Sequence, residues 1–437
     1  MQIISQILFS ILAAVAVYLF IKRGVQIKKN ILLGNNLVDR SEPNTRFKNM
    51  IRVAFGQQKM FAKPIPALLH LMIYVGFLVV NLEMLEIIID GIFGTHRAMS
   101  YLMPWGLYTA FINLFEFFAV LVILSCVAFL VRRNIMHISR FHKPEMAKWP
   151  TLDANLILIF EILLMFFLLN MNATDSIIQN ASAPNQSFFF SDMFIGLYTS
   201  ASMDTIILAE RIYWWAHICG VFFFANYVLL SKHLHIFLAF PATYFANLSP
   251  KGKLPNMDAV TTEVKIMLGL ENPNSSAPAS IARFGAKDVE DLSWRNILNA
   301  YSCTECGRCT ESCPANITGK KLSPRKIMMD VRDRADALGQ YKIKHGADAH
   351  DGLSLADGYI TEEELFACTT CNACTEACPI NLNPLEIIVD LRRYKAMEES
   401  KGPTEWMGVY QNLETNFSPW KMPVQDRFKW ATEAGNS

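Results

Sequence analysis

The chain has 437 residues, of which 52% are hydrophobic and 18% charged, and its formal net charge is +1. This length allows two or three domains, and a nearly neutral chain without a basic run gives no support to a nucleic-acid partner. The apolar residues concentrate before residue 245, so we expect the two halves of the chain to differ in kind.

Five stretches of the first half are long and apolar enough to cross a bilayer, for which about 20 residues are needed. A buried core helix is the alternative for any one stretch, but five in succession with few charges favour a membrane bundle. The first stretch lacks a basic segment before it and a small-residue cleavage site, so we interpret it as a retained span. The expected spans are approximately 3–21, 65–89, 106–131, 152–171 and 206–231.

The distribution of Lys and Arg predicts the orientation of this bundle. The loops 22–63 and 132–150 are rich in both residues, whereas the loops 90–105 and 172–205 offer only Arg97. Basic loops tend to stay in the cytoplasm. We therefore expect a bacterial inner (cytoplasmic) membrane protein with its N-terminus outside and its C-terminal half in the cytoplasm.

Four histidines lie in or beside the expected spans. His70 is early in the second span, His217 is inside the fifth, and His233 and His235 follow at the cytoplasmic end of the fifth. If one helix continues that far, His217 and His235 share a face and lie about 27 Å apart. A haem between two helices needs a histidine from each at matching depth. We expect His70 and His235 to be the axial pair of a haem b, with His233 as the alternative.

His217 would serve a second haem nearer the outer face. The second span, however, has Val80, Asn81 and Met84 where the other ligand would stand. We therefore expect one haem and leave a second open. The alternative is that a membrane histidine only hydrogen-bonds a neighbouring helix, but polar residues at this depth are costly and usually functional.

Glu83, Glu86, Glu116 and Glu161 also fall within the spans and should face the bundle interior, a cavity or each other. They either handle protons beside a quinone or form neutral hydrogen-bonded contacts between helices. Glu116 and Glu161 are our candidates for quinone and proton chemistry. Glu83 and Glu86 are expected to lie close enough to the outer interface to be solvated.

The second half is expected to be helical, because no strand-like alternation of any length appears. Helices are predicted over 288–300, 324–338 and 384–397, and Thr361 followed by three glutamates marks another helix start. The fold class is therefore all-α: a five-span transmembrane bundle followed by an α-helical two-cluster ferredoxin domain. The expected domains are 1–240 for the bundle, 241–285 for a linker, 286–400 for the cluster domain and 401–437 for a docking tail.

Two runs of one pattern, Cys-x2-Cys-x2-Cys-x3-Cys-Pro, account for eight of the ten cysteines. A cubane iron–sulfur cluster needs four thiolates, and in chains with two such runs the fourth cysteine of each usually ligates the cluster of the other. We therefore predict two [4Fe–4S] clusters. The first is assigned to Cys303, Cys306, Cys309 and Cys378, and the second to Cys368, Cys371, Cys374 and Cys313.

Structural zinc and disulfides are the alternatives for these cysteines. Zinc sites take their ligands in two pairs and leave the third cysteine at the same short spacing unexplained. Disulfides need an oxidising compartment, whereas the expected topology puts this half of the chain in the cytoplasm. Both alternatives are less consistent with the pattern than two clusters.

With these motifs in view, the chain resembles the membrane-bound iron–sulfur oxidoreductases related to heterodisulfide reductase. Its first half is similar to the five-span haem b subunit of respiratory nitrate reductase, and its second half to the helical two-cluster subunit of heterodisulfide reductases. Within that group it is most similar to proteins proposed to pass electrons between electron-transferring flavoprotein and menaquinone. The resemblance rests on Trp215-Ala-His217, Ser231-Lys-His233-Leu-His235, Ala239-Phe-Pro241, Asp291-Leu-Ser-Trp294, both cysteine runs, Asn412-Leu-Glu-Thr, Pro419-Trp420 and Arg427-x2-Trp430.

The resemblance implies an electron-transfer subunit that connects a cytoplasmic redox partner to menaquinone through two [4Fe–4S] clusters and haem b. Related chains usually continue into domains with paired Cys-Cys motifs, which this sequence lacks. We therefore expect a separate cysteine-rich catalytic iron–sulfur subunit as a partner, with electron-transferring flavoprotein as another. The alternative function is a membrane anchor and assembly platform that has no quinone chemistry of its own.

Overall fold

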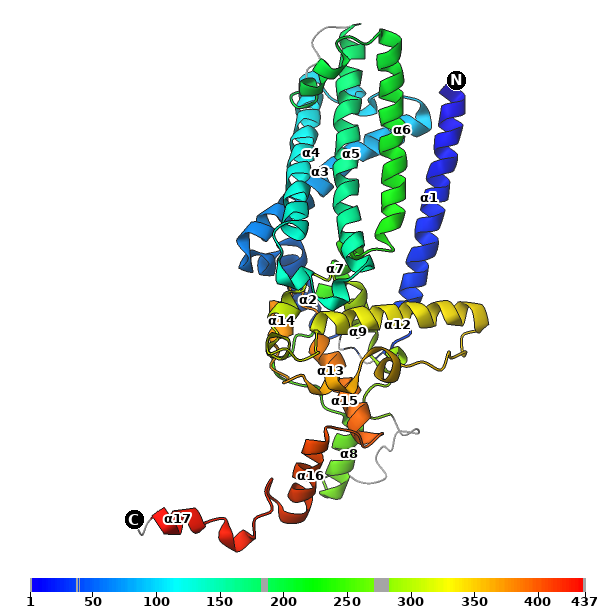
Figure 1. Ribbon diagram of the computed structural model, residues 1–437. Helices are drawn as coiled ribbons and strands as arrows, with labels where there is room; N and C mark the ends of the chain where they lie inside the picture. Colours follow the sequence, from blue (N-terminus) through cyan, green and yellow to red (C-terminus); the bar gives the residue numbers. More distant parts are fainter. Residues whose placement is uncertain (1, 37, 39, 182–187, 271–282, 435–437) are drawn as a thin grey trace.

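The structure, a computed structural model, describes residues 2–36, 38, 40–181, 188–270 and 283–434. Every regular element in these ranges is a helix, and a single isolated bridge pairs Asn35 with Ser293. The helices form a bundle of long rods, a domain of shorter helices at one end of it, and a C-terminal tail that extends away from both (Figure 1). The expected all-α fold class is confirmed.

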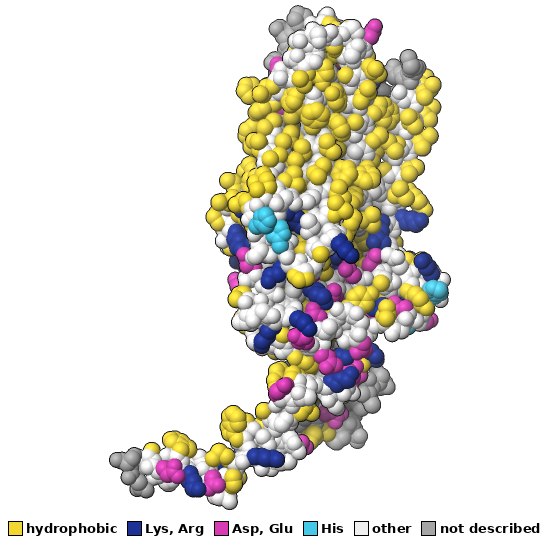
Figure 2. Space-filling model, in the orientation of Figure 1, with side chains coloured by type: hydrophobic (Ala, Val, Ile, Leu, Met, Phe, Trp, Pro, Cys, Tyr) yellow, Lys and Arg dark blue, Asp and Glu magenta, His cyan; other side chains and the backbone are white. Residues whose placement is uncertain are grey.

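Five helices are long and apolar enough to cross a membrane. Apolar side chains cover the visible face of the bundle, while Lys, Arg, Asp and Glu gather on the domain below it (Figure 2). The first four helices extend beyond the apolar stretches that predict them; the first, for example, includes Lys28 and Lys29, which the sequence pattern places in a loop. The fifth helix begins and ends three residues earlier than its predicted span. The five are α1 (Gln2–Ile31), α3 (Pro64–Phe93), α4 (Trp105–Asn134), α5 (Trp149–Asn180) and α6 (Met203–Val228).

The bundle core lies between α3, α4, α5 and α6, and α1 lies at its edge. Phe9 of α1 is fully buried and reaches α3 at Gly91, where a Cβ would lie 2.7 Å from the phenyl ring. Near its other end, α1 contributes Ile27 and Ile31 to the core of the cluster domain. The two parts of the chain are therefore joined by shared packing as well as by the backbone.

Short helices fill the junction between the bundle and the cluster domain. α2 (Pro43–Met50), η1 (Ile51–Phe55) and η2 (Gln58–Ala62) connect α1 to α3. After α6 the chain turns through η7 (Lys232–Leu234) into α7 (His235–Tyr244). The expectation that His217 and His235 lie on one continuous helix is therefore wrong. Ser231 caps the new turn by accepting a hydrogen bond from the His233 amide at 3.0 Å.

The segment expected to be a linker contains α8 (Asp258–Met267), and part of it, 271–282, lies outside the described residues. The cluster domain that follows is built around α12 and α15, and the predicted helix over 384–397 agrees with α15 at both ends. Thr361 and Glu364 form a capping box at the start of α13, as the sequence indicated. The domain comprises α9 (Trp294–Tyr301), α10 (Arg308–Glu311), α11 (Pro314–Ile317), α12 (Pro324–His345), α13 (Glu362–Phe366), α14 (Ala373–Ala377) and α15 (Pro384–Met397).

The C-terminal tail has little packing of its own. It carries α16 (Thr404–Asn416) and α17 (Lys429–Ala434) and points away from the cluster domain (Figure 1). Of the three tryptophans in the tail, Trp406 packs edge-on against Phe366, while Trp420 and Trp430 are exposed. The docking role of the tail stays a prediction.

Candidate functional site

The two cysteine runs adopt the same unusual backbone conformation. The second residue after the first cysteine is left-handed in both runs, at φ 54° for Glu305 and 56° for Thr370. The fourth residue after the first cysteine is left-handed as well, at φ 73° for Gly307 and 61° for Asn372. Such turns point successive backbone N–H groups to one side and form concave sites for anions. The repeated spacing thus folds into two copies of one loop.

The thiols of the first run surround a small cavity together with cysteines of the second. The cavity is lined by Cys303, Cys306, Cys309, Cys374 and Cys378, closed by Pro379 and Met328. Cys303 and Cys309 both interact electrostatically with Cys306 and Cys378. The structure thus brings the fourth cysteine of the second run to the three thiols of the first, as the assignment of the first cluster requires.

A second group of thiols forms around Cys368. Its thiol interacts with those of Cys313 and Cys371, and Cys374 interacts with Cys368 and Cys313. The two groups differ in their surroundings: Cys303 and Glu305 are buried, whereas Cys371 at the corresponding second loop is exposed. One loop therefore faces the interior of the protein and the other faces solvent.

None of the ten cysteines forms a disulfide in the structure. In the described part of the chain, no three Cys, His, Asp or Glu side chains come close enough to hold a single metal ion. Burial raises the pKa of Cys303 to about 12 and that of Cys378 to about 11. Both thiols therefore hold their protons at neutral pH in the absence of a metal centre, and a centre that binds them must displace those protons.

Several donors and cations lie next to the sulfur atoms. The amide of Leu382 donates to Cys378 Sγ at 3.3 Å, and the amide of Thr370 donates to Cys368 Sγ at 3.4 Å. Arg392 interacts electrostatically with Cys368, and Lys59 does so with Cys378. Positive charge and N–H groups near sulfur favour the reduced form of a bound cluster.

An ion-pair network ties the first cysteine loop to the bundle. Glu305, between Cys303 and Cys306, contacts the ammonium of Lys232 and accepts a hydrogen bond from Arg332 at 2.7 Å. Burial alone would raise the pKa of Glu305, but the charges of Lys232 and Arg332 outweigh it and lower the pKa. The loop is thus held against the turn that follows α6.

A second clamp involves Arg325 at the start of α12. Its buried guanidinium donates to the carbonyl of Arg140 at 2.7 Å and to the carboxylate of Glu145 at 2.7 Å. Glu145 also accepts from Ser323 at 2.6 Å. Because Arg140 and Glu145 lie between α4 and α5, this clamp joins the cluster domain to the bundle independently of the first.

The structure brings together three of the four candidate histidines at the junction. The ring centres of His70 and His235 lie 6.2 Å apart, and those of His233 and His235 lie 5.5 Å apart. His235 Nδ1 donates to the carbonyl of Lys232 at 3.1 Å, and His70 Nδ1 lies 3.1 Å from Gln57 Oε1. Among the residues that the structure describes, neither Nε2 has a hydrogen-bond partner, which is the arrangement of histidines that bind metals.

His217 lies apart from that group, inside the bundle. It is 1% exposed, and its Nδ1 donates to the Leu164 carbonyl at 2.9 Å. Its Nε2 has no hydrogen-bond partner within the described ranges. No second histidine of α3 stands opposite it, in agreement with the sequence. His217 therefore has an Nε2 atom open to a metal, but α3 offers no second histidine to complete an axial pair.

The candidate glutamates differ in their partners. Glu116 is fully buried and accepts hydrogen bonds from Asn172, the amide of Phe190, and the amide and hydroxyl of Ser191. These donors anchor the segment before α6 to α4. Glu161 by contrast lies 4.0 Å from His233 Nε2, beside the histidine group. Of the two candidates, only Glu161 lies next to other candidate site residues.

The expectation that Glu83 and Glu86 are solvated at the outer interface is wrong. Their side chains are buried, with 2% and 3% of the residue exposed. α3 extends four residues beyond the predicted span, and the chain after it folds back over the helix end. Glu86 accepts hydrogen bonds there from the Met99 amide at 2.9 Å and from Tyr108 at 3.0 Å.

A cavity of about 210 Å³ opens beside the histidine group, between the bundle and the first cysteine loop. Its polar wall combines His233 and His235 with four cations, and Thr304 next to Cys303 closes one side. The cations are Arg132, Arg133, Arg140 and Lys232. We did not predict Lys232 or Glu305 from the sequence, although both stand inside motifs that we singled out. Gln57 lies in no motif that we singled out, so the sequence offered no indication of its contact with His70.

These observations define the class of protein: helices suited to a membrane, joined to a helical domain with two cysteine loops. Residues 302–382 match the 4Fe-4S dicluster domain family. The chain is thus an iron–sulfur membrane protein.

Comparison with known proteins narrows the relationship. A probable iron–sulfur-binding oxidoreductase, FadF, of Bacillus subtilis is 29% identical, and the aligned region covers 99% of this chain and 61% of the relative. The EtfAB:quinone oxidoreductase of Syntrophomonas wolfei is 26% identical over 87% of this chain and 53% of its own length. One subunit of the dihydromethanophenazine:CoB–CoM heterodisulfide reductase of Methanosarcina acetivorans is 25% identical over 33% of this chain and 35% of its own length.

The chain is therefore related to iron–sulfur oxidoreductases, including subunits of heterodisulfide reductase. It spans 61% and 53% of the length of the first two of these relatives. No solved structure shows a significant match.

Proposed function

We propose that this chain is a membrane electron-transfer subunit that connects a redox partner on the cluster-domain side to menaquinone in the bilayer. The observation that carries the proposal is the position of Lys232. Its side chain holds the first cysteine loop through Glu305, and its carbonyl orients His235. The names of two relatives, an iron–sulfur-binding oxidoreductase and an EtfAB:quinone oxidoreductase, support the same interpretation.

The cysteine loops fit two [4Fe–4S] clusters. Cys303, Cys306, Cys309 and Cys378 would hold the first, and Cys368, Cys371, Cys374 and Cys313 the second. Each cluster, when bound, would take up and release single electrons. The loops supply the left-handed turns, the amide donors and the nearby cations that suit an anionic sulfur-ligated group.

His70 and His235 fit the axial positions of a haem b. Their ring centres lie 6.2 Å apart, and an iron held between them would be bonded by one nitrogen of each ring. Arg132, Arg133 and Arg140 would pair with carboxylate groups of the porphyrin. A cavity of about 210 Å³ opens beside His235.

The same junction suits the headgroup of menaquinone. The cavity has an apolar wall that includes Phe129 and Leu158, and a polar wall that includes His233. Such a combination is typical of small-molecule sites. Glu161 and His233 are 4.0 Å apart and would hold and pass protons at the quinone oxygens.

The solvent-facing second cysteine loop is the expected contact for the soluble partner. Cys371 is exposed, as are Thr369 and Thr370 before it. The partner would be electron-transferring flavoprotein or a cysteine-rich catalytic iron–sulfur subunit, and the exposed aromatic residues of the tail would contact it. The basic loops favour a cytoplasmic location for this side of the protein and an external N-terminus for α1.

The decisive experiment is anaerobic purification followed by iron and sulfide analysis, a pyridine haemochrome spectrum and reduction of the haem by a menaquinol analogue. We expect about eight irons per chain from two clusters, one haem b, and haem reduction that depends on His70 and His235. If the clusters are present but the menaquinol analogue does not reduce the haem, the result would instead support the anchor and assembly function. Well under eight irons would contradict the cluster assignment.

A further inference from the structure

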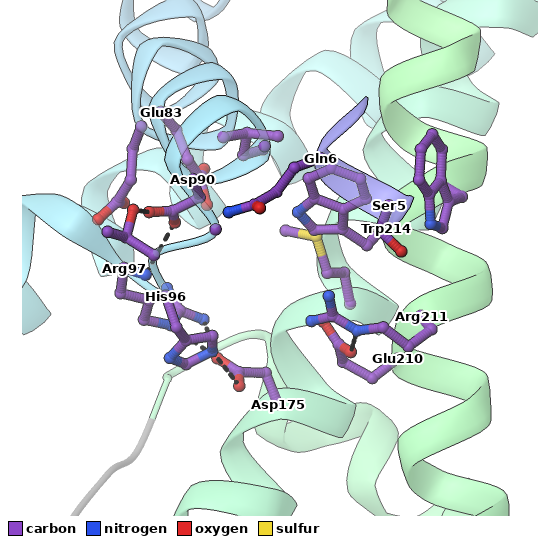
Figure 3. A pocket seen from close by; sticks show the side chains of 17 residues that line it. Ser5, Gln6, Glu83, Asp90, His96, Arg97, Asp175, Glu210, Arg211 and Trp214 are labelled. Carbon is purple, nitrogen blue, oxygen red and sulfur yellow. Dashed lines mark hydrogen bonds and ion pairs between the residues drawn. The ribbon is translucent and has the colours of Figure 1, made fainter. Parts of the chain in front are cut away.

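A large cavity in the bundle has no part in the proposed electron route. It encloses about 570 Å³ at the end of the bundle opposite the cluster domain. Residues of α1, α3, α5 and α6 line it together with the chain after α3, as Figure 3 shows. At about 30 Å³ per molecule, this volume has room for roughly 15 to 20 waters. A polar, roomy cavity of this kind holds water.

Most of the charged groups in this cavity are fully partnered. Asp175 accepts from Arg97 at 2.6 Å and from His96 at 2.9 Å, and Glu210 pairs with Arg211 (Figure 3). Asp90 accepts from the amides of residues 97 and 98 and from Thr95. These groups form fixed ion pairs or caps, so none of them needs a ligand.

Glu83 is the exception. It lines the cavity, only 2% of it is exposed, and its Oε2 has no hydrogen-bond partner among the residues that the structure describes. Glu86, one turn further along α3, has two donors, the amide of Met99 and the hydroxyl of Tyr108. The contrast between these neighbours singles out Glu83 as a carboxyl group with an oxygen open to a proton.

The charge balance around Glu83 favours a neutral carboxyl. Arg97, the cation that interacts with it, already pairs with Asp175, and Glu86 and Glu116 add negative charge. A buried charge without a partner is costly, and a carboxylate in that position takes up a proton instead. The titratable and charged groups that face this region are Glu86, Asp90, His96, Arg97, Tyr108, Glu116, Asp175, Glu210 and Arg211.

We propose that this cavity is a proton-exchange site, in which Glu83 takes protons from water on the face opposite the cluster domain and returns them there. In the step, an O–H bond of a hydronium ion in the cavity breaks and an O–H bond forms at Glu83 Oε2, so that the carboxylate becomes neutral and water is left behind. Asn172 connects this group to a second buried carboxylate, because its amide interacts with Glu83 and donates to Glu116 at 3.2 Å.

The inference is independent of the proposed electron transfer, since it needs neither clusters nor quinone. It is tested by infrared spectroscopy of the full chain in sealed vesicles. The wild type should show the C=O stretching band of a protonated carboxylic acid, which shifts on exchange into D₂O. The difference spectrum between the wild type and Glu83→Gln should contain the C=O band of one protonated carboxylic acid. The difference spectrum between the wild type and the matched control Glu86→Gln, at a carboxylate with two donors, should not contain it.

The wild type alone provides the second measurement, in case Glu83→Gln does not fold. The band should disappear as the pH is raised in the compartment that faces the cavity, and should not respond to the pH of the compartment that faces the cluster domain. A Glu83→Gln variant that retains the whole band, or a wild type in which no component of the band titrates from the compartment that faces the cavity, would overturn the proposal. None of these outcomes depends on cluster content or quinone activity.

Discussion

The ammonium of Lys232 contacts the carboxylate of Glu305, and the carbonyl of the same lysine accepts a hydrogen bond from His235 at 3.1 Å. One residue thus connects the first cysteine loop to the histidine pair. A side chain that joins two candidate redox sites fixes both their separation and the charge between them. Replacing Lys232 should therefore change measurable properties of both the first cysteine loop and the histidine pair.

Lys232→Met should lower the midpoint potential of the first cluster, because it removes a positive charge and leaves Glu305 paired with Arg332 alone. We expect a shift of about 30 to 60 mV, since about 59 mV corresponds to 1.4 kcal/mol for one electron. Potentiometric titration followed by EPR measures it. Lys232→Arg is the control and should change the potential little. Equal midpoints in the wild type and Lys232→Met would show that the contact has no electrostatic role.

Cys378→Ser should remove the EPR signal of the first cluster while leaving a signal from the second. Its thiol lies with those of Cys303 and Cys306, although it belongs to the other run. Cys313→Ser should have the converse effect. Cys219→Ser, at an exposed cysteine outside both runs, is the control and should retain both signals. Loss of the second cluster in Cys378→Ser, with the first intact, would refute the crossed ligation.

His70→Ala should abolish bound haem b, because it removes one of the two rings whose centres are 6.2 Å apart. The pyridine haemochrome spectrum measures the loss. His137→Ala, at an exposed histidine between α4 and α5, should leave haem content unchanged. A His70→Ala variant that retained full haem would contradict the assignment of His70 and His235 as the axial pair.

Glu145→Gln should destabilise the junction by about 1–3 kcal/mol at neutral pH, the range for hydrogen bonds to charged groups. Burial raises the pKa of Glu145, but Ser323 and Arg325 outweigh it and lower the pKa. The carboxylate therefore stabilises the folded protein above its unfolded pKa of about 4.3. This contribution disappears as the pH falls through the pKa of Glu145 in the folded protein, which lies below its unfolded pKa.

Thermal unfolding in detergent between pH 3 and pH 7, in about half-unit steps, measures both effects of Glu145→Gln. The variant should lose part of the acid dependence that the wild type shows. Glu376→Gln is the control, since its ion pair with Lys251 is largely exposed and such pairs contribute about 0–1 kcal/mol. Identical pH profiles for the wild type and Glu145→Gln would contradict the expectation.

Gly339→Ala should destabilise the contact between α12 and α1. A Cβ at this glycine would lie 2.0 Å from Asn30 Oδ1, and the same carboxamide donates to Tyr301 and to Asp336 at 3.0 Å. We expect a loss of about 1–3 kcal/mol, as for other overpacked sites. Gly358→Ala, with no atom within 4 Å of its Cβ, is the control. Thermal unfolding of both variants provides the comparison.

Patterns that depend on short segments of sequence predicted the structure well. The apolar stretches indicated five long helices, and the helices predicted over 324–338 and 384–397 begin at Pro324 and Pro384, as expected. The spacing of the cysteines indicated two equivalent loops, and both have the same left-handed residues. Each of these features is determined by residues within a few turns of one another, which is why the sequence shows them.

Features that depend on tertiary contacts could not be predicted. His235 lies on a different helix from His217 because the chain turns after Val228, where no glycine or proline marks the break. The sequence pattern places Glu83 too near the surface because the chain after α3 folds back over it. The role of Lys232 requires Glu305, which lies 73 residues away in the sequence.

The matching left-handed residues of the two cysteine loops mean that the domain is built from two copies of one structural unit. The two loops differ where they meet their surroundings: the shared position holds Glu305, buried at 4% exposure, in one loop and exposed Thr370 in the other. One loop conformation thus serves two settings, one packed against the bundle and the other open to solvent.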